Sequence, residues 1–390
     1  MNTAKAIAPA LAACAAALGL AACSGGAGMQ ATPPSAIAPA TTQSSTQAKA
    51  TSQTNESDAG SLEKKAAIPA LAARASVTKS PEKRKTWFAK DVGAMPRLLF
   101  ISDYGANDVD VFTMPGQTLK GQITGLSSPE GLCEDASGNI WVANTAAEEM
   151  LQYSRSGALL KTLSVPNEFP ASCAVDRKTG DLAVSNIEST SGPGNIMIFK
   201  NGSGSGTPYS SASIYQYFFA GYDESGNLFF DGTDETRSTS YFAELPAGGS
   251  SPKVISLSNG TLHFAGMVQW YKVGGYVALG DQQCGGTTSA CIYWVSVSGS
   301  TGSITGTTNL SNYSGGQVCD LTQGVIAADE ERYVAGADYE ACGYTPTTTN
   351  RWDFPAGGSP TNDDNTASFV EPIGAAISFQ VAVSAQRFNV

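Results

Sequence analysis

The stretch that decides the fold is Pro129-Glu-Gly-Leu-Cys-Glu-Asp-Ala-Ser-Gly-Asn-Ile-Trp-Val-Ala-Asn144. Residues 132–135 form a short extended run, and residues 136–139 form a turn in which Gly138 can adopt a positive φ without strain. Residues 140–143 are β-branched or aromatic, so they predict the returning strand. The stretch therefore predicts a β-hairpin with an apolar inner strand.

One hairpin cannot bury its apolar face alone, and the chain supplies further copies. Two clear copies cover 169–186 and 219–231, and two weaker ones join 266–270 to 275–281 and 318–321 to 332–338. The aspartates before the first three turns, Asp135, Asp176 and Asp223, are spaced by 41 and 47 residues. A period of this length indicates a repeat architecture.

A further predicted strand and a turn follow each hairpin. These third strands are expected at 109–112, 150–153, 196–199, 241–245, 291–294 and 351–354. A polar outer strand can follow each turn. Four strands per repeat are typical of a β-propeller blade.

The two ends of this region complete one blade between them. Residues 97–103 read as a second strand that lacks a first, and residues 371–378 read as a first strand that lacks a second. We therefore expect an all-β, six-bladed β-propeller closed by its C-terminal strand. Closure removes exposed sheet edges that promote aggregation.

The repeat resembles the NHL repeat and the related SMP-30/gluconolactonase-like propeller repeats. The resemblance is strongest over residues 129–145 and extends to about residue 231, although the arginine usual after the NHL hairpin is absent. The chain as a whole resembles bacterial lipoproteins with NHL-like propellers. The resemblance implies a fold, and a fold alone does not define a function.

Residues 1–23 predict a lipoprotein signal peptide. An apolar run follows Lys5, and Leu20-Ala-Ala-Cys23 matches the bacterial lipobox. Cys23 would carry acyl chains that anchor the protein in the membrane; the alternative is an ordinary secretory signal. No aspartate follows Cys23, so we expect export to the cell envelope and anchoring in the outer membrane of a two-membrane cell.

Residues 24–90 are rich in Ala, Thr, Ser, Gln and Pro, and predict a disordered tether. Their net charge is +5, and Lys83-Arg-Lys85 could contact anionic lipid or simply be solvated. Residues 91–390 carry 13 basic and 30 acidic residues and form the predicted propeller. Their acidity argues against a nucleic-acid partner, because such binding depends on phosphate neutralisation.

The cysteines support an oxidising compartment. Apart from Cys14 and Cys23, the chain has six, and we expect disulfides rather than a zinc site because Cys-x2-Cys spacing is absent. The repeat suggests three pairs: Cys133 with Cys173, Cys284 with Cys291, and Cys319 with Cys342.

One face of the predicted propeller gathers the ends of the second strands and the loops between blades. The strands end at Asp103, Asn144, Asn186, Asp231, Asp281 and Asp338. Oxygen ligands of this kind suit Ca²⁺, while the alternative is that each side chain caps its own turn.

Three further residues are candidates on the same face: Glu130, Tyr217 and His263. Tyr217 belongs to the aromatic run 215–219, which could stack on a sugar ring or belong to the core. His263 is the only histidine, which excludes histidine-rich catalytic sites. No nucleophile elbow, P-loop or haem motif is present, and we assign no catalytic residue.

The resemblance to gluconolactonases implies a divalent metal held by Glu, Asn and Asp oxygens. By residue type and blade position, Glu130, Asn144, Asn186 and Asp231 could play these parts. The sequence nevertheless favours a membrane-anchored binding scaffold without a cofactor, whose partner is a protein, a glycan or a small molecule. The alternative is a Ca²⁺-dependent lactonase or related hydrolase.

Overall fold

The computed structural model describes residues 85–312, 316, 318, 321–327, 332–338, 348–364 and 369–380, without the side chains of 362–364. The predicted signal, with Cys23, and almost all of the predicted tether lie outside these residues. In the described part of the chain, every regular element is a β-strand or a single-turn 3-10 helix. The helices are η1 (Val92–Ala94), η2 (Thr145–Ala147), η3 (Lys200–Gly202) and η4 (Cys284–Gly286). None of the described helices is long and apolar enough to span a membrane.

The described strands form five sheets. The first contains, from outside inwards, β1 (Trp87–Phe88), β4 (Leu119–Thr124), β3 (Asp108–Thr113), β2 (Arg97–Asp103) and β25 (Pro372–Phe379). The second contains β8 (Leu159–Ser164), β7 (Glu149–Tyr153), β6 (Ile140–Asn144) and β5 (Pro129–Glu134). The third contains β12 (Thr207–Tyr209), β11 (Gly192–Phe199), β10 (Leu182–Ser189) and β9 (Glu168–Val175).

The fourth sheet is twice as large as a four-stranded repeat. It comprises one meander of β13 (Gln216–Tyr222), β14 (Leu228–Thr233), β15 (Ser240–Leu245) and β16 (Lys253–Ser258), and a second of β17 (Ala265–Tyr271), β18 (Tyr276–Asp281), β19 (Cys291–Ser298) and β20 (Thr301–Asn309). The outer strands β16 and β20 pair in parallel and join the two meanders. The fifth sheet contains β21 (Val325–Ile326), β22 (Tyr333–Asp338), β23 (Thr348–Asp353) and β24 (Asn362–Asp364).

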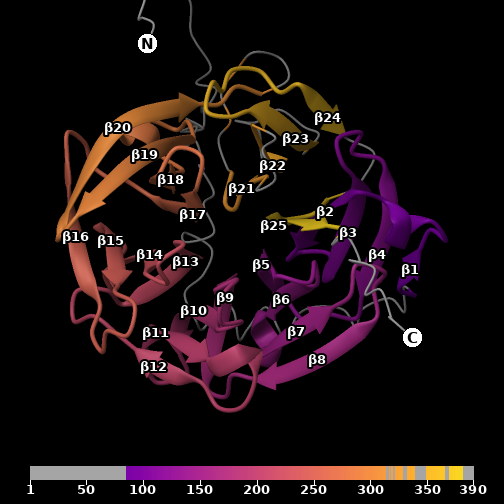
Figure 1. Cartoon of the computed structure of the whole chain (residues 1–390), viewed down its shortest axis with the longest axis horizontal. Helices are drawn as coiled ribbons and strands as arrows, with labels where there is room; N and C mark the ends of the chain where they lie inside the picture. The colour runs from indigo at the N-terminus through magenta and orange to yellow at the C-terminus, as the bar shows by residue number, and fades with distance from the viewer. Residues whose placement is uncertain are drawn as a thin grey trace, which may run out of the picture. The chain divides into compact units, whose positions relative to one another are not determined.

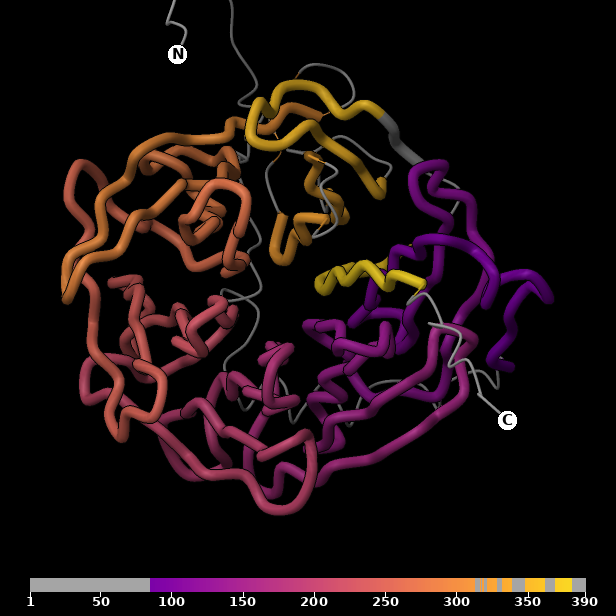
Figure 2. The backbone as a smooth tube through the Cα atoms, viewed as in Figure 1, coloured from indigo at the N-terminus to yellow at the C-terminus, as the bar shows by residue number. Residues whose placement is uncertain are grey.

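The meanders are arranged as in a propeller, with their innermost strands around a common axis (Figure 1). The inner strands contact one another in the order β25, β5, β9, β13, β17, β21 and back to β25. The C-terminal strand β25 pairs with β2, with Leu99 opposite Ile377. Figure 2 shows this yellow segment returning to the indigo start of the ring. The predicted pairing of the last strand with the first sheet is therefore confirmed.

The turn of the defining hairpin is held by its own side chains. Asp135 accepts hydrogen bonds from the backbone amides of Ser137 (2.8 Å) and Asn139 (3.0 Å), and Gly138 has a φ of 80°. The third repeat uses the same arrangement, in which Asp223 accepts from the amide of Asn227 (2.9 Å). These Asx-type turns fix the register of the inner two strands.

The core lies between neighbouring sheets. Fully buried Phe100 and Val111 of the first sheet pack in one cluster with Leu132 and Val142 of the second. Burying a side chain of this size contributes about 1.5–3 kcal/mol, and each of these sheets obtains part of this burial from its neighbour.

Two predicted boundaries are wrong. The first strand of the fifth sheet lies at β21, not at 318–321, because Val318 and Leu321 pack into the core shared with the preceding meander. The propeller also begins before residue 91, since β1 pairs with β4 and Phe88 occupies the space beside Gly121.

Two of the predicted disulfides are present. Cys133–Cys173 joins the inner strands β5 and β9 of neighbouring sheets, and Cys284–Cys291 closes the loop between β18 and β19. Cys319 and Cys342 lie outside the described residues. The first bond is a covalent link between two sheets that also meet through side-chain packing and through polar contacts such as the hydrogen bond from Thr145 to the carbonyl of Pro170 (2.6 Å).

Candidate functional site

Asp103, at the end of β2, is buried and holds the closing strand in place. Its carboxylate accepts hydrogen bonds from the backbone amides of Val370 (2.6 Å) and Glu371 (2.8 Å), which precede β25, and of Ala106 (3.0 Å). Burial raises the pKa of Asp103, although these hydrogen bonds oppose the shift. The side chain therefore acts as a connector between the two ends of the ring.

The two asparagines at the equivalent positions are also engaged. Asn144 accepts from the amide of Ser127 (2.6 Å) and donates to Glu149 (2.7 Å). Asn186 donates to Asn195 (2.9 Å). Both asparagine side chains are buried: Asn144 holds the loop before β5 and reaches β7, and Asn186 reaches β11.

The aspartates of the fourth sheet make similar contacts. Asp231 accepts from the amide of Phe219 (2.8 Å), and burial raises its pKa well above the usual value. Asp281 accepts from the amides of His263 (3.1 Å) and Phe264 (3.0 Å). Asp338 is fully buried at the end of β22. At Asp103, Asn144 and Asp281, the repeated position thus fastens the segment before or at the start of the first strand to the end of the second.

The remaining candidates of this face differ in accessibility. Glu130 is buried, and burial and the nearby charge of Glu371 raise its pKa well above the usual value. Tyr217 is fully buried in the core, where its hydroxyl accepts from the amide of Ser211 (2.7 Å). The His263 ring lies 3.3 Å from the Asp281 carboxylate (Nδ1 to Oδ2) and is partly exposed. Among these three, only His263 presents a substantial surface.

A cavity of about 990 Å³ lies on the axis of the ring. It is lined by the C-terminal halves of the inner strands and by the hairpin turns that follow them. On β5, residues 132–134 line the cavity, whereas residues 129–131 do not. The cavity therefore opens towards the hairpin turns, at the end of the ring opposite to the face that the sequence favoured.

Gln323 forms the floor of the cavity, and it is not among the site residues predicted from the sequence. The side-chain oxygen of Gln323 accepts from the amides of Leu132 (3.0 Å) and Ala375 (3.1 Å). Its nitrogen donates to the carbonyl of Leu132 (2.9 Å). Gln323 lies just before β21, so its side chain connects the start of this strand to β5 and β25 across the axis.

A second glutamine acts in the same way on the wall. Gln269 of β17 donates to the carbonyl of Ile326 and accepts from its amide, both at 2.8 Å. A glutamine within the otherwise apolar run 266–270 was the available sequence signal. Both contacts join segments far apart in the chain, so the sequence alone did not reveal them.

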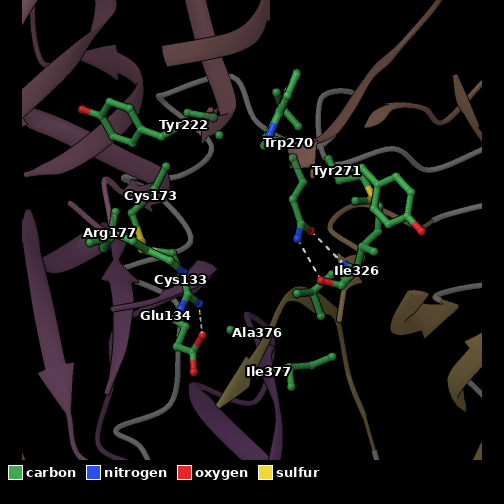
Figure 3. A pocket seen from close by; sticks show the side chains of 18 of the residues that line it. Cys133, Glu134, Cys173, Arg177, Tyr222, Trp270, Tyr271, Ile326, Ala376 and Ile377 are labelled. Atoms are coloured by element: carbon green, nitrogen blue, oxygen red, sulfur yellow. Dashed lines mark hydrogen bonds and ion pairs between the residues drawn. A yellow bond between two sulfur atoms is a disulfide. The ribbon is translucent and has the colours of Figure 1, made fainter. Parts of the chain in front are cut away.

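The mouth of the cavity carries charged groups that pair with one another. Glu134 pairs with Arg177 and accepts from the amide of Phe379 (2.8 Å). Burial raises the pKa of Glu134 to about 7, although Arg177 acts in the opposite direction. Figure 3 shows Glu134 and Arg177 beside the disulfide, across the pocket from Trp270. The site can hold a largely apolar ligand and contact it with polar groups.

Residues 95–187 match the family model described as the SMP-30/Gluconolactonase/LRE-like region. This chain is similar to the SMP-30-like β-propellers. No curated protein sequence matches it. Two solved structures share the fold of this chain: the Nidogen/Laminin complex (TM-score 0.55) and a protein of unknown function from Bacteroides caccae (TM-score 0.53). Each alignment has 11% identity and covers 73% of this chain and 99% of the other, so the likeness shows the fold alone.

The SMP-30-like resemblance implies a divalent metal, and the four residues proposed to hold it differ in how they are engaged in this structure. Asn144, Asn186 and Asp231 each bind protein partners, and Glu130 is buried beside another carboxylate. In the described ranges, no group of three or more His, Cys, Asp and Glu side chains could hold a metal ion. Many polar atoms of this face hold the propeller together, whereas Asn186 Oδ1 and Asp231 Oδ2 are buried without a hydrogen-bond partner among the described residues.

Proposed function

We propose that this protein is an exported, lipid-anchored propeller of six blades that binds a ligand in its axial cavity. The observation that carries the proposal is the cavity itself, which has the volume and the largely apolar lining typical of a ligand site. On the opposite face, Asp103, Asn144 and Asp231 are engaged with the backbone. A binding scaffold without catalytic residues is the function these features support best.

The blade number is part of the proposal. Four meanders stand in sheets of their own, and the eight-stranded sheet counts as two blades joined at their outer strands. The circular order of the six inner strands supports this division. A crystal structure with an open ring, or with another number of repeats, would contradict it.

The anchor rests on the lipobox at Cys23 and on the polar segment that follows it. We expect metabolic labelling with a fatty acid to mark the wild-type protein and not Cys23→Ser. The wild type should sediment with the outer membrane of a two-membrane host, whereas the variant should be soluble in the periplasm. Equal labelling of both proteins would refute the lipidation site.

Ligand binding is tested by thermal denaturation with a panel of small molecules, glycans and short peptides. A compound at about 100 times its Kd should raise the Tm by about 4 °C in a domain of this size. Val273, 60% exposed at the cavity mouth, and Leu159, 54% exposed on the outer strand β8, provide matched sites. Val273→Trp should reduce the shift and Leu159→Trp should not; equal shifts in both variants would refute the cavity as the site.

The second candidate is a Ca²⁺-dependent lactonase, which the family-model match over residues 95–187 favours. Such an enzyme should hydrolyse sugar lactones, lose activity in EDTA and regain it with Ca²⁺. Glu130→Gln should then abolish activity while leaving the fold intact. Absence of both hydrolysis and a Ca²⁺-dependent Tm shift would exclude this candidate.

A further inference from the structure

The inner strand of each meander is an edge strand, because it pairs with a neighbour on one side only. Along such a strand, every second residue points its N–H and C=O away from the partner strand. On β9, the amide of Asp176 bonds the carbonyl of Asp181 (2.9 Å) across the hairpin. Val175 and Cys173 therefore direct their backbone groups to the axis, and both line the cavity.

The next two inner strands have the same geometry. On β13, the amide of Asp223 bonds across the hairpin to Asn227 (2.9 Å), which directs Tyr222 and Ala220 to the axis. On β17, the amide of Gly275 bonds the carbonyl of Tyr271 (2.9 Å). The adjacent Trp270 then directs its backbone groups to the cavity, whereas the carbonyl of Val268, which also lines the cavity, lies close to Gly221 of β13.

On the other half of the ring, side chains already cover the equivalent backbone groups. Gln323 bonds Leu132 of β5 and Ala375 of β25, and Gln269 bonds both backbone groups of Ile326 on β21. Each glutamine presents a C=O and an N–H side by side, as a peptide group does. Side-chain amides of the protein thus supply hydrogen-bond partners to three of the six inner edges, those of β5, β25 and β21.

The edges of β9, β13 and β17 lack such partners among the residues that the structure describes. No hydrogen bond reaches the axial backbone groups of Val175, Tyr222 or Trp270 from this part of the chain. The indole Nε1 of Trp270 is also buried without a partner there. The edges of β9, β13 and β17 therefore form one wall of the cavity. On this wall, the backbone groups of Val175, Tyr222 and Trp270 can accept a partner of the peptide type.

We infer that the cavity binds an extended peptide segment whose backbone pairs with the edges of β9 and β13. The inference rests on the proposed function, since it names the ligand class of the same cavity. An added strand supplies alternating C=O and N–H groups along an edge, which a rigid sugar does not. Ala174, Ala220 and Gly221 make the wall small and apolar, which favours a peptide with small, uncharged side chains.

The length of the lining strand segments suits this occupant. Residues 173–175 of β9 line the cavity, and three residues of a strand extend about 10 Å, so a peptide of three residues matches this part of the wall. The charged groups at the mouth, Glu134 with Arg177 and Lys272 with Glu224, are already paired. A peptide without charged side chains therefore enters without leaving a buried charge unpaired.

The experiment uses the full chain and N-acetyl-trialanine methylamide as the probe. Hydrogen exchange measured by mass spectrometry should show slower exchange in peptides covering β9 and β13, and unchanged exchange on the outer strand β8. An analogue with an ester in place of the central amide loses one N–H donor. Calorimetry should find that this analogue binds about tenfold more weakly, as loss of one hydrogen bond predicts.

A matched pair of variants tests the protein side. Val175→Pro removes the axial N–H of β9, and the ladder bonds to β10 persist because proline is tolerated where the N–H faces away from the partner. Val175→Ala shortens the same side chain and keeps the N–H. The proline variant should bind the probe about tenfold more weakly, and the alanine variant should bind within twofold of wild type.

The outcomes separate the two proposals. An ester that binds as tightly as the amide, with protection confined to the cavity, overturns backbone pairing and leaves the cavity as the ligand site. Tighter binding of N-acetylglucosamine than of the peptide overturns the ligand class. If hydrogen exchange on the inner strands stays unchanged with every probe and with every compound that raises the Tm, the proposed function is overturned as well.

Discussion

Glu134→Gln tests the electrostatics of the cavity mouth. Burial raises the pKa of Glu134 to about 7 from the ordinary 4.5. Its side chain is only 7% exposed, so solvent screens this effect little. The unfolded chain releases the proton near pH 4.5, whereas the folded protein retains it until about pH 7. Between pH 4.5 and about 7, folding therefore takes up a proton at Glu134. The contribution of this group to the free energy of unfolding falls as the pH rises through this range.

The magnitude follows from the shift. Each pKa unit corresponds to about 1.4 kcal/mol, so the carboxylate lowers the free energy of unfolding by about 3 kcal/mol at pH 8 relative to pH 4. Glutamine has the same shape, can accept the hydrogen bond from Phe379 and does not ionise. We expect Glu134→Gln to match wild type near pH 4 and to be about 3 kcal/mol more stable at pH 8.

Two measurements check this prediction. Urea denaturation at intervals from pH 4 to 8 gives the difference between the proteins, and ¹³C NMR of the labelled carboxyl gives the pKa of Glu134 directly. Arg177→Gln is the companion variant: it removes the charge that lowers the pKa of Glu134, so the midpoint should rise further. A midpoint near 4.5, or a stability difference independent of pH, would refute the reasoning.

Three further variants address what holds the ring together, each followed by urea denaturation. Asp103→Ala leaves up to three amides without an acceptor and should lower the free energy of unfolding by about 2–4 kcal/mol. The control Asp91→Ala, at an exposed position, should change it by no more than about 0.5 kcal/mol. Equal effects of the two variants would count against Asp103 as the residue that joins the two ends of the ring. The double variant Cys133→Ser with Cys173→Ser should lose about 4 kcal/mol because the bond closes a loop of 40 residues, and an unchanged midpoint would contradict this. Gln323→Leu should lose about 2–4 kcal/mol with little change in volume, and a neutral effect would show that water replaces the side chain.

The architecture could be predicted because it depends on local patterns that repeat. Each hairpin carries its turn residues and its apolar strand within about 16 residues, as residues 129–144 show. The pairing of Cys133 with Cys173 followed from their equivalent places in neighbouring repeats. The first strand of the fifth sheet was placed wrongly at 318–321. Val318 and Leu321 are as apolar as strand residues, but they pack between sheets.

The cavity could not be predicted for a different reason. Its floor depends on Gln323 meeting Leu132, 191 residues away in the chain. Nothing in the local sequence distinguishes such a glutamine from a solvent-exposed one. The conspicuous residues, Asp103 and its equivalents, recur in every repeat because they connect strands, and this periodicity directed attention to the opposite face.

The central claim is that ligand binds inside the ring, on the side of the hairpin turns. A crystal structure of the protein with a compound that raises its Tm tests this claim most directly. We predict electron density for the compound against β9 and β13, within hydrogen-bond distance of the axial backbone groups of Val175 and Tyr222. Density at the opposite end, among Asn144, Asp231 and Asp281, would contradict the account.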